Sequence, residues 1–179
     1  PLTTGAWCRC LKTEPGGFDL SKERGGWDEW TGAAAWLSQH YWWHYEFHED
    51  KEFLRTRAYP FLKEVALFYE DFLIPDPRKD SPYYGKLITV PSVSPENSFK
   101  GGTLPNSIGI GATSDFEFIY DVLTHCIKAS EILKIDEEDR EKWSEILENI
   151  PPFQIGKHGQ LQEWLEDYAE PEPSHRHVT

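Results

Sequence analysis

Two helix-forming blocks separated by a long proline-containing stretch constrain the fold of this sequence more than any other feature. In the first block, apolar and aromatic residues recur at helical spacing, which predicts a helix over Thr31–Phe47. Asp50 is expected to start the next helix and Pro60 to divide it, because proline is accepted in the first turn of a helix but not inside one. A continuous apolar stripe follows Pro60, made of Phe61, Val65, Phe68, Tyr69, Phe72 and Leu73.

The second block predicts a further pair of helices. Ser114 and Glu117 have the spacing of a capping box, and a strongly amphipathic run follows them. Asp136 is expected to cap the next helix and Pro151 to stop it. A last short helix is expected over Gln160–Tyr168. The residues expected to form the buried face of the Asp136-capped helix are Trp143, Ile146, Leu147 and Ile150.

The stretch between the blocks, Pro75–Thr113, holds six prolines and five glycines, which argues against helix. Within it, only Lys86–Val90 indicates a strand. A loop of this length in a helical protein is usually functional or disordered, and Leu87–Asn97 is too apolar for a flexible linker, so we expect it to line a pocket. The paired helices with short joins predict an all-α protein of helical hairpins, either an open repeat array or a closed (α/α) barrel.

Composition excludes several classes of partner. The formal charge of −13 disfavours nucleic acid and anionic membrane surfaces, which would need clustered Lys and Arg. The chain has no run of about 18 apolar residues, so no membrane span is expected. The 8 Trp, 8 Tyr and 10 Phe favour carbohydrate, because aromatic rings provide flat apolar surfaces on which sugars stack. The start at Pro1 and the absence of Met indicate an excerpt of a larger protein.

Glu96 is the first candidate for chemistry, because it lies between Pro95, which restrains its approach, and Asn97. A carboxyl held there beside an apolar wall could have a raised pKa and act as a general acid. The alternative is an ordinary surface glutamate, which residue types alone favour.

A second candidate group lies near the end of the chain. Gln160–Asp167 contains Trp164 among amide and carboxylate side chains that can hydrogen-bond sugar hydroxyls. Arg176 and His177 could hydrogen-bond a hydroxyl or the leaving oxygen. The alternative is a solvated acidic helix with a polar tail. The His175-x-His177 pair lacks a third ligand in sequence, so no metal site is expected. A third group is expected to be mostly core: Trp27, Trp30, Trp36, Trp42, Trp43, His40 and His44.

Several ordered segments together resemble one known family. They are Trp30–Phe47, Asp50–Leu54, Ala58–Lys63, the Ser-Val-Ser-Pro-Glu-Asn loop Ser92–Asn97, Gln154–Asp167 and Pro171–His177. In this order they are similar to the catalytic domain of glycoside hydrolase family 95, which contains inverting α-L-fucosidases and some enzymes that act on α-L-galactosides. The similarity covers residues 30–179, whereas residues 1–29 are irregular and diverge from the family pattern.

The resemblance implies that residues 30–179 are a fragment of an (α/α)6, six-hairpin barrel with a long active-site loop. It implies that Glu96 is the general acid, with Asn97, Trp164, Arg176 and His177 as sugar contacts. It further implies a fucosylated oligosaccharide or glycan as substrate, a secreted or extracellular parent protein, and no metal or organic cofactor. The family assigns water activation to residues outside the matched segments, so the isolated fragment is expected to be inactive.

Two other classes remain open from the sequence. One is an α-L-galactosidase or another helical-barrel glycosidase. The other is a catalytically inactive helical protein that binds carbohydrate or serves as a scaffold.

Overall fold

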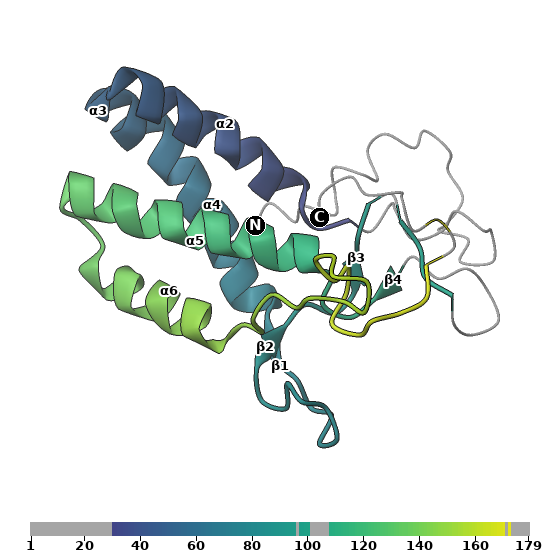
Figure 1. Ribbon diagram of the computed structural model, residues 1–179. Helices are drawn as coiled ribbons and strands as arrows, with labels where there is room; N and C mark the ends of the chain where they lie inside the picture. The colour runs from purple at the N-terminus through teal and green to yellow at the C-terminus, as the bar shows by residue number, and fades with distance from the viewer. Residues whose placement is uncertain (1–29, 96, 101–107, 171, 173–179) are drawn as a thin grey trace, which may run out of the picture.

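The computed structural model describes residues 30–95, 97–100, 108–170 and 172. In this part the chain is helix-rich, as expected, with two short two-stranded sheets (Figure 1). No helix in these residues is long and apolar enough to cross a membrane.

The first helical hairpin agrees closely with the prediction. Helix α2 spans Ala33–His48, and the side chain of Asp50 accepts hydrogen bonds from the next helix, at the backbone N–H of Glu52 and Phe53. That helix runs through α3 (Lys51–Phe53), the π-helical segment η2 (Leu54–Ala58) and α4 (Tyr59–Phe72). Pro60 lies in the first turn of α4, directly after the π-helical segment. The divide predicted at Pro60 is therefore a π-helical segment rather than a break in the helix.

The second hairpin consists of α5 (Thr113–Leu133) and α6 (Glu137–Asn149). The predicted capping box is wrong: α5 begins before Ser114, and no side chain caps it. Asp136 does occupy the N-cap of α6, but its carboxylate accepts hydrogen bonds from Tyr59 and Lys63 instead of capping the helix. The join between α5 and α6 is therefore tied to α4 through Asp136.

The main core lies between α2, α4, α5 and α6. Tyr69 and Leu62 of α4 pack there with Ile119 of α5, and Trp143 of α6 is fully buried as predicted. The predicted aromatic core on α2 is only partly correct. Trp42 is buried, whereas Trp36, Trp43, His40 and His44 are exposed.

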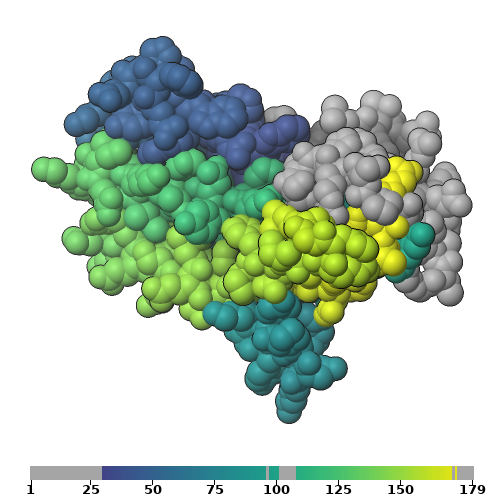
Figure 2. All heavy atoms as spheres, viewed as in Figure 1, coloured from purple at the N-terminus to yellow at the C-terminus, as the bar shows by residue number. Residues whose placement is uncertain are grey.

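The stretch between the hairpins forms two small antiparallel sheets. Strand β1 (Ile74–Pro75) pairs with β2 (Leu87–Ile88), and the connecting segment protrudes from the body (Figure 2). Strand β3 (Ser92–Val93) pairs with β4 (Ile108–Gly109) close to the start of α5 (Figure 1). The predicted strand over Lys86–Val90 is thus confirmed in its centre.

The last segment, residues 150–170, is not helical, so the helix predicted over Gln160–Tyr168 is wrong. Its backbone instead pairs with distant residues. Leu165 N–H donates to the carbonyl of Gly111 at 3.0 Å, and Lys100 N–H donates to that of Ala169 at 2.6 Å. These pairings hold the segment against the loop that follows β3 and against the residues between β4 and α5.

Candidate active-site loop

The loop that carries the predicted acid is fixed at its start by a buried serine. Ser92 Oγ donates to Asp115 Oδ2 at 2.7 Å and accepts from the N–H of Ala112 at the same distance. Because Asp115 lies in the first turn of α5, this bond joins the loop to the helix. Burial raises the pKa of Asp115 to about 6, although the Ser92 hydrogen bond opposes the shift.

Two residues further on, a second buried serine contacts a second carboxylate. Ser94 Oγ donates to Glu163 Oε1, and both residues are buried. The carbonyl of Ser94 accepts the N–H of Asn97 at 2.7 Å, which closes a four-residue turn with Pro95 in its second position. Proline is favoured there because its φ is already set for the turn.

Glu96 lies between Pro95 and Asn97 in sequence and is outside the described residues, as are Arg176 and His177. The structure does describe both sequence neighbours of Glu96. Asn97 is buried, and its Oδ1 accepts the N–H of Ser98 at 2.8 Å. The roles of Glu96, Asn97, Arg176 and His177 stay predictions.

Trp164 is only 1% exposed and belongs to a small second core. Its ring lies edge-on to Phe99 at 5.2 Å between centroids, and Phe99 stacks on Tyr168 at 4.4 Å. In this chain Trp164 therefore packs against aromatic neighbours within the described residues, and its contact with a sugar stays a prediction.

Glu117 is the carboxyl whose environment the sequence interpretation missed. Its spacing from Ser114 predicts a place in a capping box, but it is half-buried on α5. Burial, and then the negative charge of Glu163, raise the pKa of Glu117 to about 7. No local pattern could have revealed this, because Glu163 is distant in sequence and reaches Glu117 only through the fold.

An open cavity of about 320 Å³ lies in the last segment. Gln160 and Asp167, both in the predicted sugar-recognition group, lie in its wall, whereas the residues of Leu87–Asn97 do not. The full lining is Lys157, His158, Gln160, Asp167, Tyr168, Ala169 and Glu170. The prediction that Gln160 and Asp167 lie in one polar group is therefore confirmed, but the prediction that a helix carries them is wrong.

Among the described residues, no group of three or more His, Cys, Asp and Glu side chains is arranged to hold a metal ion. The His175-x-His177 pair lies outside these residues.

A known family of catalytic domains matches almost the whole chain. The sequence model of the glycosyl hydrolase family 95 catalytic domain matches residues 3–179, including most of the stretch that was predicted to be divergent. The chain therefore belongs to the catalytic-domain family of glycosyl hydrolase family 95. The boundary proposed at residue 29 stays a prediction.

Two relatives carry more specific names. Alpha-L-fucosidase 2 of Arabidopsis thaliana is 39% identical over 155 residues, which cover 86% of this chain and 18% of that protein. Probable alpha-fucosidase A of Aspergillus niger is 28% identical over 180 residues, which cover 99% of this chain and 22% of that protein. The chain spans about a fifth of the length of these curated relatives.

Proposed function

We propose that the protein to which this chain belongs hydrolyses terminal α-L-fucosidic linkages in glycans, with inversion at the anomeric carbon. The observation that carries the proposal is the family match across residues 3–179. The names of the two relatives favour fucose over other sugars.

In this proposal Glu96 is the general acid that protonates the glycosidic oxygen as the bond breaks. The turn closed between Ser94 and Asn97 supports this role, because a group on a restrained turn can be held at one position relative to the bound sugar. Asn97, Trp164, Arg176 and His177 are proposed to contact the fucose unit. A side chain supplies the proton and water is the nucleophile, so the proposed reaction uses no metal or organic cofactor.

Inversion also needs a group on the opposite face of the sugar that activates water. In typical inverting enzymes it lies about 6.5–9.5 Å from the acid. We place this group in parts of the parent protein outside the chain, as the family resemblance implies. The chain alone is therefore expected to release no fucose.

The helical hairpins support an (α/α)6 barrel as the architecture of the parent domain. Two consecutive hairpins pack side by side through contacts of α5 with α2 and α4, and α5 also contacts α6 (Figure 1). Stacked hairpins of this kind are the unit from which such barrels are built. We propose that this chain supplies two of them.

The test uses the complete parent protein, an α-1,2-fucosylated oligosaccharide and a matched α-L-galactoside. Free L-fucose is measured for the parent and for Glu96→Gln, and proton NMR identifies the anomer released first. We expect β-L-fucose from the parent and almost none from the variant, with substrate binding retained. Release that persists in the variant would exclude Glu96 as the acid. Faster hydrolysis of the galactoside would identify an α-L-galactoside as the substrate. Binding of the oligosaccharide without turnover would indicate a catalytically inactive relative.

A further inference from the structure

Glu163 is a buried carboxylate next in sequence to Trp164 of the second core. Its side chain is 2% exposed, and its carbonyl accepts the N–H of Thr113 at 3.0 Å. The hydroxyl of Thr113 donates to the carbonyl of Gln162, one residue earlier. The backbone that carries Glu163 is therefore fixed to the first residue of α5.

From this fixed position Glu163 contacts the side chain of Ser94 in the loop. Its Oε1 accepts the Ser94 hydroxyl, and the Ser94 carbonyl in turn accepts the N–H of Asn97. A buried carboxylate thus connects to the turn around Pro95 through two consecutive hydrogen bonds. In the sequence, Glu96 follows Ser94 by two residues.

This arrangement is costly for a purely structural contact. A carboxylate loses hydration when it is buried, and a well-packed apolar residue often stabilises a core at least as well. Glu163 also lies close enough to Glu117 for its charge to oppose ionisation there. A hydrogen bond to a charged acceptor offers a defined direction and position, which an apolar contact does not.

We propose that Glu163 is a positioning residue that fixes the turn between Ser94 and Asn97 through the Ser94 hydroxyl, which rests on the proposed role of Glu96 in that turn. Glu163 donates or accepts no proton in the reaction. Its effect is on the position from which the acid reaches the glycosidic oxygen. Because misplacement by about 1 Å can reduce the rate about 100-fold, loss of the contact is expected to lower kcat rather than raise KM.

The experiment compares matched variants in the complete parent protein. Ser94→Ala and Glu163→Ala remove the contact, and each is expected to lower kcat about 10- to 100-fold with KM within about threefold. Glu163→Gln keeps an oxygen that can accept from Ser94 and is expected to recover much of the loss. Ser98→Ala in the same loop and Glu138→Ala, an exposed carboxylate on α6, are the controls and should stay within about twofold.

The double variant Ser94→Ala/Glu163→Ala separates positioning from general destabilisation. If both residues act through one contact, the double variant loses no more kcat than the worse single variant. Multiplied losses would overturn the proposal, as would full kcat in Ser94→Ala. If Glu163→Ala does not fold, Ser94→Ala alone tests the same contact from the loop side, with Glu163→Gln as the variant that retains the contact.

Amide hydrogen exchange gives a readout that does not depend on activity. The Asn97 amide, bonded to the Ser94 carbonyl, is expected to exchange faster in Ser94→Ala, whereas amides of α6 stay unchanged. Unchanged exchange at Asn97 would overturn the positioning role. If the parent releases no fucose, the proposed function fails, and the exchange measurement still decides whether Glu163 positions the turn.

Discussion

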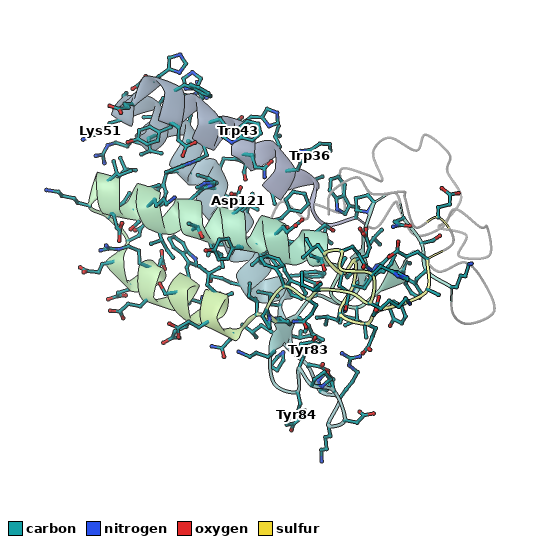
Figure 3. The ribbon with its side chains drawn as sticks, viewed as in Figure 1. Trp36, Trp43, Lys51, Tyr83, Tyr84 and Asp121 are labelled. Carbon is teal, nitrogen blue, oxygen red and sulfur yellow. The ribbon has the colours of Figure 1, made fainter. Side chains whose placement is uncertain are left out.

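The outward face of α2 gives a prediction that contrasts this chain with its parent protein. Trp36, Trp43 and Phe47 are 51%, 45% and 85% exposed and recur at helical spacing along one face. Figure 3 labels both tryptophans along α2. The adjacent face, with Ala35 and Trp42, is buried. A helix that is apolar on both faces is normally covered on both.

The size of this face sets the expected effect. A tryptophan or phenylalanine buries about 150–250 Å², so the exposed parts of the three rings leave about 270–450 Å² of apolar surface. At about 25 cal/mol per Å², covering this surface contributes about 7–11 kcal/mol. The largest apolar patch on a soluble domain is typically about 300–600 Å² and often marks an interaction site. We therefore expect the isolated chain to self-associate, and the parent domain to cover the face.

The perturbation is the double substitution Trp43→Gln/Phe47→Gln, made in the isolated chain and in the parent. In the isolated chain it should shift the sample toward monomer, measured by analytical ultracentrifugation, with a thermal midpoint within a few degrees of the unsubstituted chain. In the parent, loss of a buried aromatic residue costs about 3–5 kcal/mol, so the thermal midpoint should fall clearly. The matched control is Tyr84→Gln, an exposed aromatic residue in the protruding segment between β1 and β2, which Figure 3 also labels.

Two results would refute this reasoning. A monodisperse isolated chain at high concentration would show that the face does not drive association. A parent protein that tolerates the double substitution as well as Tyr84→Gln would show that the rest of the domain leaves the face exposed.

Three further predictions concern buried groups in the described part of the chain. Burial raises the pKa of Asp115 from 3.8 to about 6, so its carboxyl favours folding below pH 4 and this stability is lost as pH rises through 6. The asparagine in Asp115→Asn does not titrate, so the free energy of unfolding of this variant should rise relative to that of the unsubstituted chain by about 3 kcal/mol between pH 4 and 7, measured by urea unfolding. Asp136→Ala should lower the free energy of unfolding by about 1–2 kcal/mol, because Lys63 and Tyr59 lose their shared acceptor. The control Glu138→Ala removes an exposed carboxylate and should leave the urea unfolding midpoint unchanged. Cys126 is buried with a raised pKa, so in a Cys8→Ser/Cys10→Ser background it should react with a thiol reagent only after unfolding; rapid native labelling would contradict its burial.

The helices could be predicted because their signals are local. The stripe from Ile119 to Cys126 and the face around Trp143 are periodic, and the structure buries them. Helix α2 begins two residues after the predicted helix over Thr31–Phe47 and ends one residue later, and of the aromatic residues expected in its core only Trp42 is buried. Periodicity identifies an apolar face without showing whether its partner belongs to the same stretch of chain.

The end of the chain could not be predicted from local patterns, because distant residues determine its backbone. Gln160–Tyr168 has helix-forming residues, but Leu165 and Ala169 are bonded to Gly111 and Lys100 instead of to one another. The side-chain amide of Gln162 also donates to the carbonyls of Trp164 and Leu165, which satisfies groups that a helix would otherwise pair. Tertiary pairing thus overrides the local helical preference.

The same non-local pairing explains why the candidate site lies where the two hairpins are joined. The loop contributes Ser92 and Ser94, the start of α5 contributes Asp115, and the last segment contributes Glu163. Each carboxylate accepts one serine hydroxyl, so the loop is held on two sides by groups that the sequence separates widely. If Glu163 positions the turn as proposed, Asp115 should matter mainly for stability and Glu163 mainly for kcat. This division of roles would not arise if the two carboxylates were equivalent structural contacts.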